Sequence, residues 1–140
     1  MSWRKRIEKV LTARDLPDGS PPQSKRRMAE KTGDYTCVDS DSGTFFFTTG
    51  ADVDFTLPAV SLTGWHAWFY CMVDDELRVS SAPSDLIVGF NDIDLDLVEY
   101  TTDGDQIGQA FYFVSTGAKW LCMPMHWDTA THAVTITIVD

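Results

Sequence analysis

The sequence predicts an all-β protein: a β-sandwich or jelly-roll-like body that carries an extended N-terminal arm with a short helix. From Tyr35 onward the apolar residues recur with a period of two, which is the spacing of β-strands. Turn-forming residues recur at short intervals in the same region. No stretch after residue 31 shows the period and length of an ordinary helix. Short strands in such a series are typical of sandwiches and small barrels.

The arm begins with an expected amphipathic helix over about 2–14, which Ser2 can cap. Its apolar stripe consists of Trp3, Ile7, Val10 and Leu11. Because so short a helix is marginal in water, it needs an apolar groove to dock on. We therefore predict a partner-docking element made of this stripe together with two basic neighbours, Arg4 and Arg6.

A proline-rich linker follows the helix. Residues 15–23 hold three prolines and a glycine, which predicts an extended chain. Residues 24–31 are expected to form one helical turn or to stay irregular. The expected division is an arm over 1–33 and a body over 34–140, with residues 1–31 extended away from the body and ordered by a partner.

The body is expected to be a series of short strands separated by turns. The alternating or β-rich runs cover 35–38, 44–49, 53–57, 65–73, 77–79, 85–88, 93–100, 109–115, 119–123 and 133–139. Asp39-Ser-Asp-Ser-Gly43 is expected to be a turn built from Asp and Ser side-chain hydrogen bonds. No repeat of fixed period is visible, which argues against a solenoid or a propeller.

The charge is divided unevenly along the chain, whose formal net charge is −10. Residues 1–31 hold nine basic and four acidic residues, a net +5, whereas residues 32–140 hold two basic and 17 acidic residues, a net −15. Such a body repels nucleic acid and anionic membranes, and only the arm can attract either. No apolar run reaches the length of a membrane span, and no apolar segment follows the basic residues near the N-terminus, so a secretory signal is not expected. We therefore expect neither nucleic acid nor membrane as a partner.

Three cysteines and three histidines offer little sign of nucleophilic chemistry. Without a C-x-x-C pair, the cysteines are expected to be free and buried in a reducing compartment. No local signature ties a histidine to a cysteine, so packed or hydrogen-bonded histidines are expected. The residues concerned are Cys37, Cys71, Cys122, His66, His126 and His132.

An acidic run invites a calcium site at Asp92, Asp94 and Asp96, with Asp103 and Asp105 nearby. The alternative is a solvated acidic sheet face, because strand alternation puts the three aspartates on one side and Ile93, Leu95 and Leu97 on the other. An EF-hand loop would also need a glycine where Leu97 stands. The strand interpretation is favoured, so no bound metal is expected.

Catalytic motifs are missing from the sequence: there is no G-x-S-x-G, P-loop, dinucleotide fingerprint or H-E-x-x-H. A glycosidase carboxylate pair is disfavoured, since no acidic residue stands in an apolar context that would raise its pKa. We therefore expect no enzymatic activity, no catalytic residue and no cofactor. The aromatic residues are expected in the core. Exposed, clustered Trp65, Trp68 and Trp127 would instead indicate a lectin-like binding module.

Several turns and aromatic strands together resemble a known family. The pattern comprises residues 35–45 with their Asp-Ser-Gly turn, Thr49-Gly50-Ala51, Phe55-Thr-Leu-Pro-Ala59, the aromatic strand after Gly64, and Lys119-Trp120. It resembles a β-domain of bacteriophage virion proteins, found in head decoration proteins and in tail-fibre or appendage modules. The three successive phenylalanines, the many aspartates and the basic arm depart from that pattern.

The resemblance implies a structural virion protein. Within it, a capsid decoration or cement protein on the particle exterior is expected, made in the host cytoplasm and docked through its arm to the major capsid protein or another virion protein. The alternatives are a tail, neck or fibre component and the lectin-like host-binding module. The family also implies a homotrimer, whose apolar contact would have to outweigh the repulsion between acidic bodies.

Overall fold

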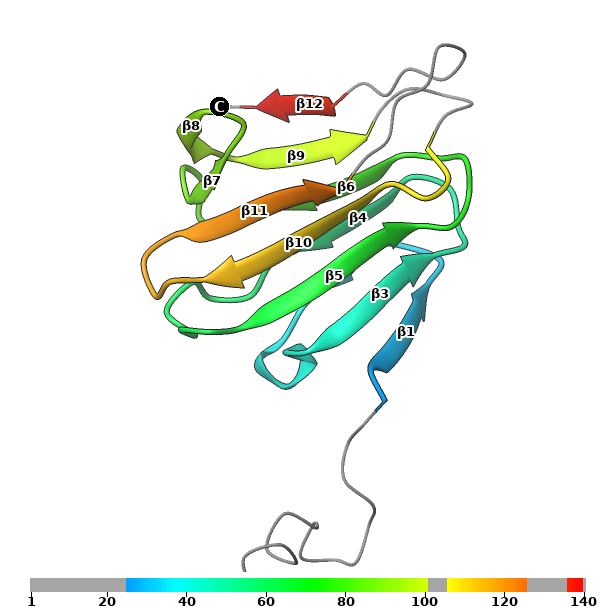
Figure 1. Ribbon diagram of the computed structural model, residues 1–140, viewed down its shortest axis with the longest axis horizontal. Coiled ribbons are helices and arrows are strands. Elements are labelled where there is room, and N and C mark those ends of the chain that lie inside the picture. Colours follow the sequence, from blue (N-terminus) through cyan, green and yellow to red (C-terminus); the bar gives the residue numbers. More distant parts are fainter. Residues whose placement is uncertain (1–24, 101–105, 126–135, 140) are drawn as a thin grey trace, which may run out of the picture.

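The computed structural model describes residues 25–100, 106–125 and 136–139, and these form two packed β-sheets (Figure 1). The seven-stranded sheet has the order β1-β3-β5-β10-β11-β7-β8 and the five-stranded sheet the order β12-β9-β6-β4-β2. The first contains β1 (Arg27–Lys31), β3 (Thr44–Thr48), β5 (His66–Cys71), β7 (Ile87–Gly89), β8 (Asp92–Leu95), β10 (Ala110–Ser115) and β11 (Trp120–Met125). The second contains β2 (Tyr35–Thr36), β4 (Val53–Thr56), β6 (Leu77–Ser80), β9 (Leu97–Tyr100) and β12 (Ile136–Val139).

The all-β prediction is confirmed for the described part of the chain, where the helical structure consists of a 3-10 turn, η1 (Asp39–Asp41). The turn over 39–43 is also confirmed: a carboxylate oxygen of Asp41 accepts hydrogen bonds from the Tyr35 hydroxyl and the Val38 amide. The predicted helix over 2–14 and the predicted linker over 15–23 lie outside the described residues. No helix among the described residues has the length and hydropathy needed to cross a bilayer.

The first six strands alternate between the two sheets. β1, β3 and β5 are parallel neighbours in one sheet, and β2, β4 and β6 are parallel neighbours in the other. The chain therefore winds as a short parallel coil, which differs from the antiparallel jelly roll offered as an alternative. The corresponding strands begin at residues 27, 44 and 66, at unequal intervals, so the sequence shows no repeat of fixed period here either.

The strand β1 corrects the expected boundary between arm and body. Residues 27–31 pair in parallel with β3 instead of forming a helical turn, and Ala29 packs against the core. The basic side chains suit an edge strand: Arg27 donates to the Ser42 carbonyl at 2.6 Å, and the Lys31 ammonium lies 3.4 Å from the centre of the Tyr35 ring. The sheet thus begins before residue 34, and at most residues 1–26 can extend away from it.

The predicted strand over 93–100 is divided at Asp96. β8 lies in the seven-stranded sheet and β9 in the five-stranded sheet, so the chain changes layer between them. The expectation of one buried face is wrong here, because Leu95 is buried whereas Ile93 is 64% exposed. The Asp96 carboxylate accepts the Asp85 amide at 2.7 Å, a local contact that continuous alternation does not predict.

Aromatic rings from both sheets fill the core. The Phe55 ring of β4 lies 5.4 Å from Phe46 of β3 and 4.8 Å from Phe69 of β5, centre to centre. Tyr100 of β9 stacks on Phe111 of β10 at 4.3 Å. These contacts join the two layers and exclude water from between them.

The three cysteines are free and buried within this core, as predicted. Burial raises the pKa of the thiols of Cys37, Cys71 and Cys122 to about 12. A thiol with such a pKa carries almost no thiolate near neutral pH, and the thiolate is the nucleophile and the metal ligand. The cysteines therefore act as small core side chains.

Candidate interaction face

The outer surface of the seven-stranded sheet is lined by large apolar side chains. The strand registers place one outward row of side chains on each of β1, β3, β5, β10 and β11. We call this surface the outer aromatic face. Its apolar members are Met28, Phe45, Phe47, Trp68, Tyr70, Ala110, Tyr112, Val114, Leu121, Met123 and Met125, and Glu30 of β1 and His66 of β5 lie in the same outward rows.

Rings on this face touch one another and form a layer of their own. Phe45 lies 6.4 Å from Trp68 and 5.7 Å from Tyr70, and Trp68 lies 4.9 Å from Tyr112, measured between ring centres. None of these four side chains is fully buried. The seven-stranded sheet therefore carries aromatic layers on both sides, one inside the core and one facing outward.

A hollow of about 430 Å³ lies within the outer aromatic face. Met28, Phe45, Trp68 and Tyr70 line it, together with Ala110 and Met125. Ala110 pairs with Tyr70 on one side and with Met125 on the other, and its methyl group leaves the space between these larger neighbours unfilled. The hollow also contacts Arg26, whose guanidinium lies 5.9 Å from the centre of the Trp68 ring, within cation–π range.

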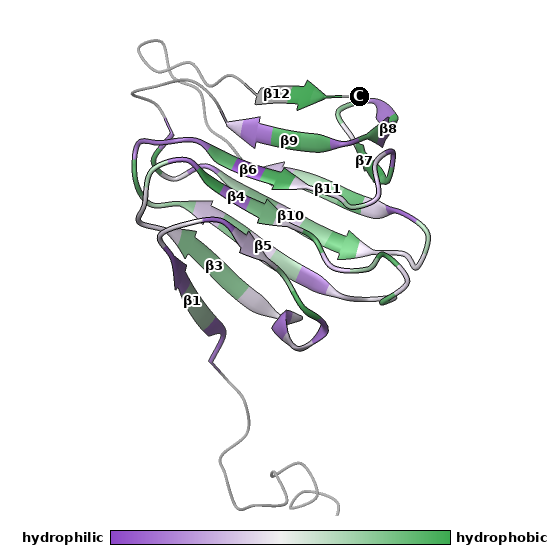
Figure 2. Ribbon diagram, turned by 180° about the vertical axis from the view of Figure 1, so that it is seen from behind, coloured by the Kyte–Doolittle hydropathy of each residue, from purple (hydrophilic) through white to green (hydrophobic). Residues whose placement is uncertain are grey.

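The five-stranded sheet has a different outer surface. Asp54, Arg78 and Glu99 lie in register across β4, β6 and β9, where Figure 2 shows hydrophilic positions within each strand. Arg78 donates to Glu99 at 2.7 Å and to Asp54 at 3.3 Å. Burial still raises the pKa of the Asp54 and Glu76 carboxyl groups. These charges pair among themselves, so the apolar surface of the other sheet is the stronger candidate for an interaction face.

A lectin-like site was expected to show exposed, clustered tryptophans, and the two described tryptophans of that set differ in exposure. Trp65 is buried at 2% exposure and packs edge-to-face on Trp120, whereas Trp68 belongs to the outer aromatic face. The two do not form a common exposed cluster. Trp127 lies outside the described residues, as do two of the histidines, His126 and His132.

His66 stands at the end of the outer aromatic face. Its ring lies 6.2 Å from Tyr112, and its Nδ1 lies 3.1 Å from the Gly64 carbonyl oxygen. Sequence reasoning did not anticipate the outer ring layer, although the run Phe45-Phe-Phe47 held the signal. Consecutive aromatic residues in one strand must place rings on both of its faces.

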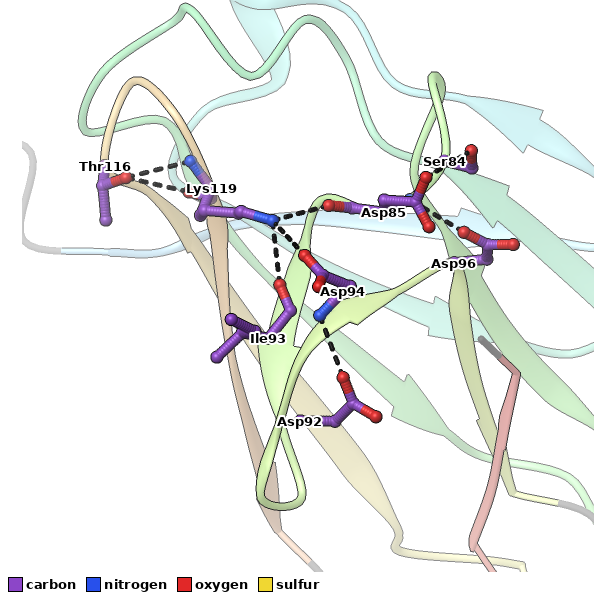
Figure 3. Close-up of polar contacts among 8 residues, drawn as sticks. All are labelled: Ser84, Asp85, Asp92, Ile93, Asp94, Asp96, Thr116 and Lys119. Carbon is purple, nitrogen blue, oxygen red and sulfur yellow. Dashed lines mark hydrogen bonds and ion pairs between the residues drawn. The ribbon is translucent and has the colours of Figure 1, made fainter.

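The acidic run is organised by Lys119 (Figure 3). Its ammonium donates to the Asp94 carboxylate at 2.8 Å and to the carbonyl oxygens of Asp85 at 2.7 Å and Ile93 at 2.9 Å. The other carboxylates have separate roles: Asp92 accepts the Asp94 amide, and Asp96 accepts the Asp85 amide. Within the described ranges, no three or more acidic, cysteine or histidine side chains gather where they could hold a metal ion. The prediction that Asp92, Asp94 and Asp96 share one solvated strand face is therefore wrong.

Replacing Lys119 by methionine is expected to lower the free energy of unfolding by about 1 kcal/mol. The change keeps the apolar stem but leaves two carbonyl groups and the Asp94 carboxylate without their donor. The loss stays modest because the lysine side chain is 34% exposed and water can replace it. Urea unfolding would measure the change, with Lys25→Met as a control at an exposed position. Equal midpoints for Lys119→Met and the unmodified protein would contradict this role.

Comparison with protein-family models and with curated proteins finds no match to this chain. A glycine and a tryptophan of the turn and aromatic pattern have defined places in the fold. Gly43 ends the 39–43 turn with a φ of +85°, and Trp120 is fully buried in the core. Lys119, which precedes it, holds the segments around β7 and β8.

Proposed function

We propose that this chain is a structural assembly protein of a bacteriophage virion, specifically a decoration or cement protein on the capsid exterior. The outer aromatic face carries the proposal. Contiguous exposed apolar surface of this kind marks an interaction site, and Met28 and Met125 are 56% and 53% exposed there. The turn and aromatic pattern of residues 35–59 supports the choice of a virion protein among assembly proteins.

The division of the surface fits that role. One sheet offers an apolar face for contact with subunits, whereas the other carries a self-paired charged face that suits solvent. In this proposal the arm docks through Trp3, Ile7, Val10 and Leu11, aided by Arg4 and Arg6, to a virion protein or to another copy. The assembled form is a homotrimer and the chain has no catalytic role.

A lectin-like module is the second candidate, because Phe45, Trp68 and Tyr70 form an aromatic platform beside a hollow. A sugar site also needs several convergent polar groups to fix the hydroxyls. Among the described lining residues, the hollow is bordered mainly by apolar side chains and by one arginine, Arg26. The balance therefore favours a protein partner over a sugar.

Deleting residues 2–16 tests the proposal. The expected result is a folded body with an unchanged β-type circular dichroism spectrum and near-complete loss of the chain from purified particles, measured by quantitative mass spectrometry. A chain with residues 2–16 scrambled keeps the composition and charge but loses the apolar stripe, and it should also be excluded. Full incorporation of the deleted chain, or absence of the unmodified chain from particles, would refute the proposal.

A further inference from the structure

The outer aromatic face has the character of a binding hot spot. Its hollow of about 430 Å³ lies within the range of pockets that hold peptide side chains or small ligands. Aromatic residues, methionine and arginine, which are enriched at interface cores, surround it. No described segment of the chain covers Met28, Met123 or Met125, which are 45% to 56% exposed.

We propose that the outer aromatic face binds residues 2–11 of a neighbouring copy, so that copies of this chain are joined by exchange of their N-terminal arms. This inference stands independently of the virion role, since it concerns only contacts between copies. Three features lead to it: the shape of the apolar stripe, the charges of arm and body, and the point where the chain enters the sheet.

The apolar stripe suits the hollow. Trp3, Ile7, Val10 and Leu11 repeat with the spacing of one helix face, and a helix laid in an apolar groove is anchored at such positions. Tryptophan is one of the side chains that are enriched at interface hot spots, together with tyrosine and arginine. Trp3 can enter the hollow above Ala110, while the smaller members of the stripe cover the ring layer of Phe45 and Trp68.

Charge indicates that the outer aromatic face binds the arm of another copy and not the body of another copy. Residues 2–11 carry four basic residues and one acidic residue, whereas residues 27–140, which hold all the strands, carry four basic and 18 acidic residues, a net charge of −14. Two bodies that met face to face would repel each other, but an arm and a body attract. The position of Arg26 over the Trp68 ring shows that this face accepts a guanidinium, the group that Arg4 and Arg6 would bring.

The entry point of the chain favours a neighbour over the chain's own arm. Arg26 itself contacts the hollow, so the root of the arm lies beside its own binding site. Residues 12–24, with their prolines, span about 40 Å when extended. Intramolecular binding is strongest when the linker length matches the distance to be spanned. The linker starts beside the chain's own site, so it is much longer than the distance to that site. Its length fits the distance to the same site on a neighbouring copy better.

Photocrosslinking of the full-length chain tests the exchange. Benzoylphenylalanine replaces Ile7 in protein of natural isotope content, which is mixed in equal amounts with ¹⁵N-labelled protein, equilibrated and irradiated. We expect mixed-isotope crosslinks from residue 7 to Met28, Met123 or Met125. The same group at Lys5, off the stripe, should give on the order of tenfold less product.

Two matched substitutions in the receiving chain complete the test. Met125→Glu places a charge in the hollow and should lower the crosslink yield on the order of tenfold. Val38→Glu makes the same change at a residue of similar exposure, 50%, away from the sheet face, and should leave the yield unchanged. Crosslinks confined to one isotope, crosslinks to other surfaces, or none at all would each overturn arm exchange. None of these results depends on whether the chain enters particles.

Discussion

Replacing Phe69 by alanine is expected to lower the free energy of unfolding by about 3–5 kcal/mol. The Phe69 ring is fully buried and contacts Phe46, Phe55 and Phe113 at centre distances of 5.4, 4.8 and 5.8 Å. Its removal opens a cavity where the two sheets meet, and rings on three other strands lose a neighbour. Urea unfolding followed by circular dichroism would measure the loss.

The adjacent residue provides the control. The Trp68 side chain points to the opposite face of β5 and belongs to the outer aromatic face. Trp68→Ala should therefore lower the free energy of unfolding much less than Phe69→Ala. The same substitution should strongly reduce crosslinking of residue 7 of a neighbouring arm to this face. Equal stability losses for the two variants would contradict the assignment of inner and outer faces on β5.

Replacing Gly50 by alanine is expected to cost about 3 kcal/mol, the second-largest effect. A Cβ atom at this position would collide with the backbone carbonyl of Thr32, lying 2.6 Å from its carbon and 2.8 Å from its Cα. The bend after β3 lies against the bend after β1 here, as the hydrogen bond from the Thr49 amide to the Lys31 carbonyl shows. Because the obstacle is backbone, one of the two bends must move.

Gly33 is the matched control for Gly50. It follows Thr32 in the opposing bend, yet a Cβ atom there would meet nothing within 4 Å. Gly33→Ala should therefore change stability by no more than about 0.5 kcal/mol. Hydrogen exchange should show faster exchange of the β1 amides in Gly50→Ala but not in Gly33→Ala. Similar stability of the two variants would contradict the close approach of Gly50 to the Thr32 backbone.

Several features of this protein follow from local sequence patterns. Alternation of apolar residues predicts strands near 44–48, 53–56 and 110–115, because side chains on successive residues of a strand point to opposite faces. The Asp-Ser-Gly run predicts the turn at 39–43, since its side chains bond within a few residues. The buried cysteines were predictable from their small apolar character and their placement within strands.

Other features depend on which strands meet. Alternation says nothing about partners, so neither the parallel winding of β1 to β6 nor the incorporation of residues 27–31 into a sheet could be predicted. The same holds for Lys119, whose oxygen partners lie 25 to 34 residues away in sequence. The outer aromatic face also arises only when β1, β3, β5, β10 and β11 lie side by side. Each strand contributes a few apolar residues, and hydrogen bonding between distant strands gathers them into one surface.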